Sequence, residues 1–588
     1  NLPYRKYNRL VMQFGISKQI QKSKKESAFI MRKQTKLVAV ASAAALLAIG
    51  GAMTSFAAQG WVEEDGTWYF YDKDGNRVED EWKKSGDNWF WLDSEENGAM
   101  ATDKLIEDGD KTYYVDANGV MVTNTWVKVV NEDQDDDTDP AEYRYYYMKA
   151  NGEAYKSDSF SKKTIDGKKY AFDSDGKMLY GWVDKETNSL MADDEGWKTA
   201  TNYFGSWEDG AMKTGWQKIN VYDAWDDEDD DADYWFYFGS NGVKRTGTSD
   251  ADDTVRVNGK RYAFTENGEM YYKWLEKNTS SNTNSASDWK YFSSPEDGAR
   301  QTKGWFKVVP KGKLDKYGNV YAGWDAEMSS DGNDEAQWYY ADGDGNLKVN
   351  EIAKINGKYY AFDEYGAMLS GLVYMDVDGD GNITAIYAKE NDNRDADTGL
   401  DADYLDDLKD GKIEDQGTLY YFGDPDNADG DGAMKTGNVS MSVDGSSYSF
   451  NFTTSGGVGS RGAGKSGVTK KVYYKYGIKM AASSEDKYRA ASIDNDDVAT
   501  FLTTAKLKAL DTDGVKTVVY NEGKSNETKI KYYDLTGKGV SLIGTNGKIK
   551  TNSKGVKDGE DWYFFSDKEG NVTYYADDKN VTKALEQK

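Results

Sequence analysis

One short pattern recurs along most of the chain: two or more aromatic residues close together, a few polar residues and a glycine. It reads WYFYDKDG at 68–75, YAFDSDG at 170–176, WFYFGSNG at 235–242 and YAFDEYG at 360–366. A short aromatic strand followed by an Asp/Asn-Gly turn predicts a β-hairpin. Because a single hairpin cannot bury its own aromatic face, we expect consecutive hairpins to stack. The repeat therefore predicts an all-β protein, an elongated β-solenoid of stacked β-hairpin repeats.

The first two repeats define the unit. Trp61 and Trp82 lie 21 residues apart, as do Trp68 and Trp89, and a later copy ends in GAMKTGW at 210–216. In this arrangement the chain resembles the choline-binding and cell-wall-binding repeat family of Gram-positive surface proteins. The resemblance implies a β-solenoid of hairpins and binding to a cell-envelope polymer.

A longer period predicts how the chain is organised. Blocks that begin IDGKKYAF, VNGKRYAF and INGKYYAF follow one another from residue 165. We therefore expect family-like, cell-wall-binding-type repeats over 58–164 and long-period blocks with acidic insertions over 165–437. Degenerate repeats and a flexible loop segment are expected over 438–588.

The first 57 residues are not expected to belong to the repeat array. Residues 31–57 combine basic residues, an apolar stretch and small terminal residues, which is the order found in a secretory signal peptide. We expect the mature chain to begin near Ala58 and to lie outside the cell, at the cell wall or cell surface, without membrane insertion after cleavage. Residues 1–30 match nothing downstream and are expected to be translated upstream sequence that is absent from the native protein.

Composition excludes several classes of function. Cysteine and histidine are absent, so no disulfide, Cys/His metal site or histidine-dependent catalytic triad can form. The net charge of −28 disfavours nucleic acid as a partner, because phosphate binding needs clustered Lys and Arg. No stretch escapes the repeats for long enough to form a separate catalytic domain. We therefore expect a protein that is not an enzyme.

Aromatic residues are the strongest candidates for ligand binding, since Trp and Tyr faces attract a quaternary ammonium at about 0.5–2 kcal/mol per contact. The family resemblance implies a cage made by the Trp after Gly, the first Trp of the aromatic strand and an aromatic residue of the next repeat. The matching residues here are Trp61 and Trp68 with Trp82 or Trp89, and secondarily Trp216 and Trp235. Binding should concentrate in residues 58 to about 130. The YAF copies, which begin with Tyr170 and Tyr262, are expected to serve as core.

A calcium site is the second candidate. The segment DVDGDGN at 376–382 matches the start of a calcium-binding loop, with possible ligands at Asp376, Asp378, Asp380 and Asn382. The glutamate expected at the twelfth position is replaced by Tyr387. We therefore expect weak calcium binding at most, and no other cofactor. A plain Asp-Gly hairpin turn stays open as the alternative.

These features predict a non-catalytic extracellular protein that binds the cell wall through many weak aromatic contacts, summed by multivalency. The expected partner is choline-decorated teichoic acid or another wall polysaccharide. Two alternatives stay open. One is binding of an extracellular α-glucan, because sugar rings also stack on aromatic faces. The other is a structural stalk or adhesin that contacts host protein.

Overall fold

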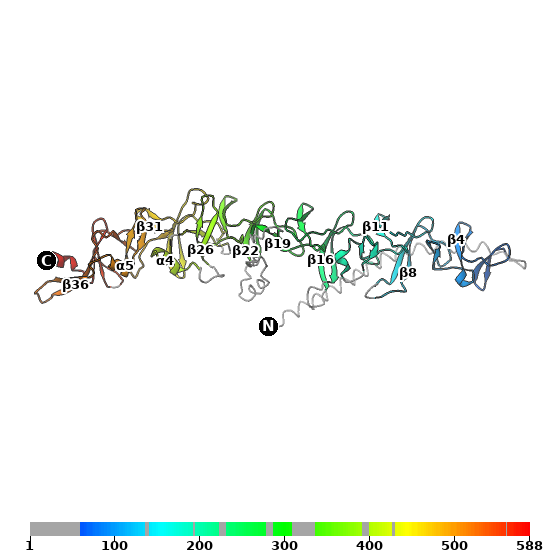
Figure 1. Cartoon of the computed structure of the whole chain (residues 1–588), viewed down its shortest axis with the longest axis horizontal. Coiled ribbons are helices and arrows are strands. Elements are labelled where there is room, and N and C mark those ends of the chain that lie inside the picture. The colour runs from blue at the N-terminus through cyan, green and yellow to red at the C-terminus, as the bar shows by residue number, and fades with distance from the viewer. Residues whose placement is uncertain are drawn as a thin grey trace. The chain divides into compact units, whose positions relative to one another are not determined.

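The computed structural model describes residues 59–135, 140–191, 195–222, 231–277, 286–308, 336–390, 399–414, 416–425, 430–559 and 561–588. The predicted signal peptide and the segment before it lie outside these residues. Strands dominate the described residues, and the expected all-β fold of stacked hairpins is confirmed. The chain divides into two compact units, Asn1–Thr246 with Phe264–Met270 and Gly247–Ala263 with Tyr271–Lys588. Figure 1 shows the succession of hairpins within each unit.

Unit 1 consists of antiparallel hairpins joined by glycine turns. Its hairpins pair β1 (Gly60–Glu64) with β2 (Thr67–Tyr71), β3 (Glu81–Ser85) with β4 (Asn88–Asp93), β6 (Lys104–Asp108) with β7 (Lys111–Val115), β8 (Thr125–Val130) with β9 (Tyr143–Met148), β10 (Lys162–Ile165) with β11 (Lys168–Ala171), and β15 (Gly215–Tyr222) with β16 (Asp231–Phe238). The short β5 (Ala99–Met100) joins the first two hairpins into one sheet, and β12 (Trp182–Asp184) pairs with both β13 (Ser189–Leu190) and β14 (Asn202–Tyr203). Its short helices are η1 (Ser94–Glu96) and α2 (Gly196–Thr199).

Unit 2 begins with the same hairpins and continues into wider sheets. The hairpins are β17 (Thr254–Val257) with β18 (Lys260–Ala263), β19 (Lys273–Glu276) with β20 (Trp289–Phe292), β21 (Gly304–Val308) with β22 (Gln337–Ala341), and β23 (Glu351–Ile355) with β24 (Lys358–Phe362). The three-stranded sheets run β26 (Ile383–Lys389), β25 (Gly371–Val377), β27 (Thr418–Phe422), and β34 (Ala499–Phe501), β33 (Tyr488–Ile493), β37 (Val540–Gly544).

The two five-stranded sheets of unit 2 lie in the segment expected to hold degenerate repeats. They run β28 (Gly437–Val443), β29 (Ser446–Phe452), β32 (Ile478–Lys479), β31 (Val472–Lys475), β30 (Gly467–Thr469), and β35 (Lys516–Tyr520), β36 (Thr528–Asp534), β40 (Val572–Ala576), β39 (Tyr563–Ser566), β38 (Lys554–Lys557). The helices of unit 2 are η2 (Ala286–Asp288), α4 (Ala402–Lys409), α5 (Thr504–Ala509) and α6 (Val581–Gln587).

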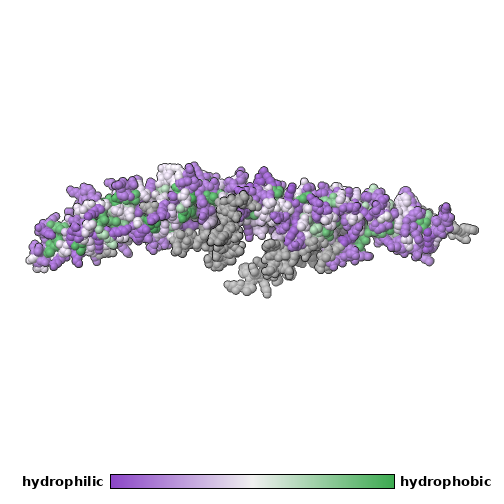
Figure 2. Space-filling view, viewed as in Figure 1, coloured by the Kyte–Doolittle hydropathy of each residue, from purple (hydrophilic) through white to green (hydrophobic). Residues whose placement is uncertain are grey.

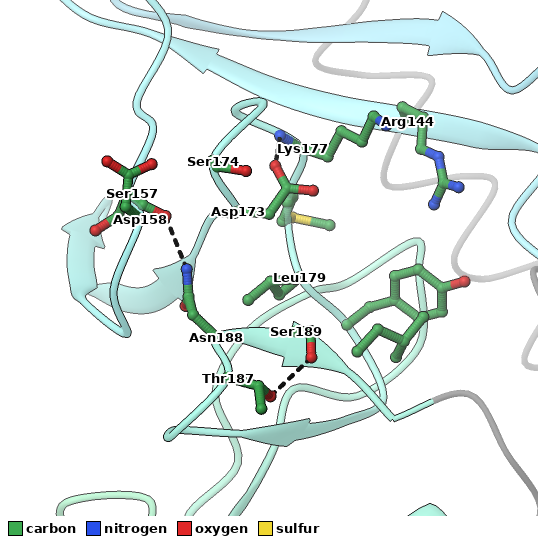
Figure 3. A pocket seen from close by; sticks show the side chains of 13 residues that line it. Arg144, Ser157, Asp158, Asp173, Ser174, Lys177, Leu179, Thr187, Asn188 and Ser189 are labelled. Carbon is green, nitrogen blue, oxygen red and sulfur yellow. Dashed lines mark hydrogen bonds between the residues drawn. The ribbon is translucent and has the colours of Figure 1, made fainter.

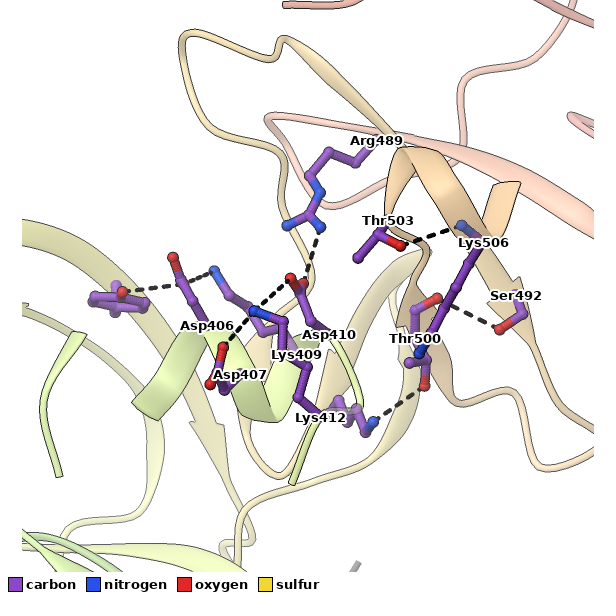
Figure 4. A network of polar contacts seen from close by, with 12 residues as sticks. Asp406, Asp407, Lys409, Asp410, Lys412, Arg489, Ser492, Thr500, Thr503 and Lys506 are labelled. Carbon is purple, nitrogen blue, oxygen red and sulfur yellow. Dashed lines mark hydrogen bonds and ion pairs between the residues drawn. The ribbon is translucent and has the colours of Figure 1, made fainter. Parts of the chain in front are cut away.

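Ion pairs fix helix α4 within unit 2, as Figure 4 shows. Arg489 on β33 lies 2.9 Å from the carboxylate of Asp410, the residue that ends α4. Lys412 pairs with Asp407 at 2.6 Å. The buried Leu405 and Leu408 lie on the same helix, in a core shared with β25, β27 and β29. These contacts attach the helix to the sheets on both sides of it in sequence.

Consecutive hairpins are joined by a backbone hydrogen bond at one repeated position, two residues after the turn glycine. The amide of Met121 donates to the carbonyl of Trp89 at 2.9 Å, and the amide of Met178 donates to Tyr145 at 2.8 Å. The same position makes the same kind of bond at Met212, Lys244, Arg300, Met368 and Met434. Each of these bonds runs back to the preceding hairpin, so the stack is held by main-chain pairing as well as by burial.

Glycine is required at the turns by close packing as well as by backbone conformation. A Cβ added to Gly152 would lie 2.6 Å from the sulfur of Met121, in the preceding turn, and Gly152 has a φ of +85°. We call this contact between a turn glycine and the preceding methionine the methionine–glycine ladder. Its further rungs are Met100–Gly119, Met178–Gly210, Met212–Gly242, Met368–Gly432 and Met434–Gly462. The repeated Gly-x-Met of the sequence is therefore a stacking motif.

Candidate ligand-binding site

A set of three aromatic rings, which we call the aromatic triad, recurs in both units. A Trp near the start of a hairpin contacts the ring opposite it on the second strand and a ring of the next hairpin. The ring centroid of Trp82 lies 5.3 Å from that of Trp91 and 5.1 Å from that of Tyr113, at interplanar angles of 62° and 66°. Such edge-to-face packing is favoured between aromatic rings. All ring distances below are between centroids. Equivalent triads centre on Trp61, Trp126, Trp182, Trp274 and Trp305.

The rings packed on Trp61 are not those named for the predicted cage, and the cage of Trp61 and Trp68 with Trp82 or Trp89 stays a prediction. Trp61 packs on Phe70 at 5.4 Å and on Phe90 of the next hairpin at 5.3 Å. Phe90 is paired with Lys83, so it lies on the opposite face of its hairpin from Trp82 and Trp89 and packs on Trp61. The alternation of side chains along WYFY and NWFWL was the signal that could have identified these rings.

Trp68 and Trp89 lie on the same hairpin faces as Trp61 and Trp82, nearer the hairpin turns. In the strand register, Trp68 is opposite Glu63, and Trp89 is opposite Lys84. Trp89 is 40% exposed, more than any other tryptophan that the structure describes. The Lys84 ammonium lies 5.9 Å from its ring centroid. Trp89 therefore offers an open aromatic face beside the Trp82 triad. The face of the molecule drawn in Figure 2 is mostly hydrophilic.

The two secondary candidates are in contact with each other. Trp216 lies 6.4 Å from Trp235 at an interplanar angle of 85°, and 5.1 Å from Tyr237. Trp305 and Trp338, which the sequence analysis did not select, repeat this geometry at 6.5 Å and 82°. The shared WxK strand followed by a Trp-led aromatic strand was the signal for that second pair.

The tyrosines that begin the YAF strands are core residues, as expected. Tyr170, Tyr262 and Tyr360 are 7–9% exposed. Tyr170 lies 4.8 Å from Trp126, and Tyr360 lies 4.7 Å from Trp305. These rings complete triads whose faces are covered by protein.

One triad is covered by a cation of the protein itself. Lys244 stands at a methionine position of the ladder, and its ammonium lies 5.3 Å from the ring centroid of Trp182. The ammonium also donates to the carbonyl oxygens of Trp197 at 2.5 Å and of Lys198 at 3.1 Å. Burial lowers the pKa of Lys244 to about 8. The sequence analysis missed this residue, although a lysine in place of methionine was visible in the repeat.

The predicted calcium ligands lie at the turn between β25 and β26. Asp378 accepts hydrogen bonds from the amides of Asp380 at 3.0 Å and Asn382 at 2.8 Å, and from the Asn382 side chain at 2.8 Å. These bonds from Asn382 hold the pKa of Asp378 below its usual value. Asp376 accepts from the Thr384 hydroxyl at 2.9 Å. Within the described residues, no group of three or more His, Cys, Asp or Glu is arranged to hold a metal ion.

A calcium ion at this turn therefore stays a prediction. We expect weak, millimolar binding because the ion would compete with the hydrogen bonds that Asp378 already accepts. The double change Asp378→Ala and Asp380→Ala should remove the heat of a calorimetric calcium titration. Asp342→Ala alters a turn with the same three hydrogen bonds, to Asp344 and Asn346, and serves as the control. Equal loss of heat in the control would contradict this location.

Comparisons with known proteins agree with the repeat geometry. A model described as a choline-binding repeat matches residues 81–126, and one described as a putative cell wall binding repeat matches residues 59–76. Both segments carry aromatic triads, centred on Trp82 and Trp61. No described helix is long and apolar enough to span a membrane.

Two curated relatives are glucosyltransferases of streptococci. Glucosyltransferase-S of Streptococcus mutans serotype c is 26% identical over 290 residues, which is 49% of this chain and 14% of the relative. Glucosyltransferase-I of Streptococcus downei is 26% identical over 347 residues, or 53% and 19%. The chain thus spans less than a fifth of the length of these relatives.

Similar solved structures come from Streptococcus pneumoniae. Choline binding protein F is 21% identical, with a TM-score of 0.28 and coverage of 57% of this chain and 99% of that one. The choline-binding domain of CbpL is 24% identical, with a TM-score of 0.23 and coverage of 37% and 90%. Taken with the motifs and the triads that they build, the matched segments, residues 59–76 and 81–126, are repeats of the choline-binding and cell-wall-binding family.

Proposed function

We propose that this chain is a non-catalytic protein of the cell surface that binds the cell wall through aromatic sites on its stacked hairpins. The observation that carries the proposal is the exposed Trp89 beside the Trp82 triad, within the segment that matches the choline-binding repeat. A single aromatic contact to a cation contributes only about 0.5–2 kcal/mol. Several linked sites on one chain raise the overall affinity through effective concentration.

The ligand that we propose is choline-decorated teichoic acid or another wall polysaccharide. A quaternary ammonium cannot donate a hydrogen bond, so aromatic faces are the groups that suit it. The chain's net charge of −28 also favours a cationic group over an anionic one. We further propose that the protein is exported by a signal peptide at residues 31–57, so that it reaches the wall from outside the membrane.

An α-glucan is the second candidate ligand. The observation that favours it is the 26% identity with the two streptococcal glucosyltransferases. Sugar rings stack on the same aromatic faces that attract a cation, and Trp89 would present such a face to either ligand. Competition therefore separates the two candidates: free choline should elute the first, and a soluble α-glucan the second.

The binding role of Trp89 gives a direct test of the proposal. We expect Trp89→Ala to lower the affinity of this one site about fivefold, because one aromatic contact is lost. Retention of the full chain on purified Gram-positive walls should weaken accordingly. Since Trp89 is exposed, the change should leave the fold intact. Tyr272→Ala is the matched control, because Tyr272 is also exposed (37%) but lies outside residues 58–130. Equal retention of the Trp89 variant and the parent chain would argue against this site.

A further inference from the structure

Unit 1 contains a polar cavity that shares no residue with the Trp61 and Trp82 triads or with Trp68, Trp89, Trp216 and Trp235. Figure 3 shows its lining. It has a volume of about 450 Å³ and lies between Arg144 on β9, the turn that follows β11 at 173–177, and the segment 187–190 around β13. The cavity is therefore built by three successive hairpins of one unit.

Charges of both signs line this cavity in equal number. Asp158 and Asp173 carry the negative charges, and Arg144 and Lys177 the positive ones. A phosphate or a bare cation would meet one repulsive pair, so neither suits the site. Ser157, Ser174, Thr187 and Ser189 add hydroxyl groups, while Leu179 and Leu190 form an apolar part. This combination suits a neutral ligand with many hydroxyl groups and an apolar C–H face.

Two polar side chains of the cavity have unused hydrogen-bonding capacity. Asn188 is only 6% exposed; its amide nitrogen donates to the carbonyls of Ser157 at 2.8 Å and Phe172 at 3.2 Å, yet its oxygen has no partner. One carboxylate oxygen of Asp173 accepts hydrogen bonds from the amides of Asp175 and Lys177. Its other oxygen accepts none from the residues that the structure describes. The Asn188 oxygen has almost no accessible surface, so the half-buried Asp173, which lines the cavity, is the acceptor that a ligand there would meet.

Asp173 differs from the matching aspartates of other turns. Asp72, Asp342 and Asp378 cap equivalent turns, and hydrogen bonds hold the pKa of each below its usual value. Asp173 accepts two amide bonds but lacks the third bond that Asn76, Asn346 and Asn382 donate in the other turns, and burial raises its pKa. The segment 187–190 lines the cavity opposite this turn. An acceptor that is partly removed from water is a good partner for a ligand hydroxyl.

We propose that this cavity binds one sugar residue of a glycan, in a site separate from the aromatic triads. The free carboxylate oxygen of Asp173 and the carboxylate of Asp158 accept hydroxyl hydrogens, and Leu179 and Leu190 pack against the C–H face of the ring. The shared chemistry is a pyranose ring, which either the glycan strands of peptidoglycan or an α-glucan can supply. This proposal does not depend on the aromatic site being the wall-binding site.

The test titrates the full chain with two oligosaccharides, in the presence and absence of saturating choline. A β-1,4-linked N-acetylglucosamine tetramer represents peptidoglycan strands, and isomaltotetraose represents an α-glucan. We expect millimolar binding of one of them, unchanged by choline. The double change Asp158→Ala and Thr187→Ala, at two exposed lining residues, should weaken it about fivefold or more through lost hydrogen bonds.

Asp175→Ala is the matched control, because Asp175 is exposed in the same turn but does not line the cavity. It should leave saccharide binding unchanged. Absence of binding by both oligosaccharides, displacement by choline, or an equal loss in the Asp175 variant would overturn the proposal. Loss of wall binding by Trp89→Ala with unchanged oligosaccharide binding would show that the two sites are independent.

Discussion

Replacing Gly464 by alanine is expected to lower the free energy of unfolding of unit 2 by about 3 kcal/mol or more. A Cβ at this position would overlap the carbonyl group of Tyr476 and lie 2.8 Å from the amide nitrogen of Gly477. Both are main-chain atoms, so no side-chain rotation relieves the overlap. The amide of Gly464 also donates to Leu419 at 2.7 Å, the bond that joins this turn to the preceding sheet. Urea denaturation of the full chain measures the loss.

Two other glycines make this experiment specific. A Cβ on Gly379 would meet nothing within 4 Å, so Gly379→Ala should change stability by no more than about 0.5 kcal/mol. Gly152→Ala should fall between the two, because there the overlap is with the flexible end of Met121. A Gly464 variant as stable as the Gly379 variant would show that close main-chain stacking does not limit the fold.

Lys244 should make the stability of unit 1 depend on pH in the alkaline range. Its folded pKa is about 8, below the ordinary 10.5, because burial disfavours the charged form. Between these values the unfolded chain binds more protons than the folded chain, so stability rises with pH. Relative to Lys244→Met, the parent chain should gain about 3 kcal/mol between pH 7 and pH 10.5. Below pH 8 Lys244 is charged in both the folded and the unfolded chain, so this gain in stability is absent.

The comparison with methionine is informative because methionine occupies the same position in most turns of the ladder. Denaturation of both proteins over this pH range gives the difference directly. Lys168→Met, at an exposed lysine of the same unit, is the control for the change of side chain. If the stability difference between the parent and Lys244→Met does not change with pH, the Lys244 side chain keeps its usual pKa. The Trp182 triad would then not bury it.

The sequence predicted the hairpins because the aromatic strand and the turn glycine are local signals. It did not predict which rings meet, because partner choice depends on strand register. Gly60 pairs with Tyr71, which places Phe70 opposite Trp61 and brings Phe90 onto it. A shift of one residue would have turned every ring to the other face. The triad centred on Trp82 depends on register in the same way.

Other features were out of reach of local patterns. The cavity beside Asp173 combines residues from three hairpins, and its unpartnered Asn188 oxygen becomes visible only when the side chain's neighbours are known. In the segment 376–382 a local pattern was visible but ambiguous. The hydrogen bonds that Asp378 accepts recur at Asp342, in an ordinary turn. The spacing of acidic residues could not separate a metal ligand from a turn cap.

Binding to the cell wall is expected to reside in the first repeats. Retention on purified walls should be measured for a fragment of residues 58–165, which contains the Trp61 and Trp82 triads and Trp89, and for a fragment of residues 257–588. We expect the first fragment to hold most of the affinity of the full chain and the second to hold little. Equal retention of the two fragments would contradict it, because binding would then not reside in the tryptophans of the first repeats.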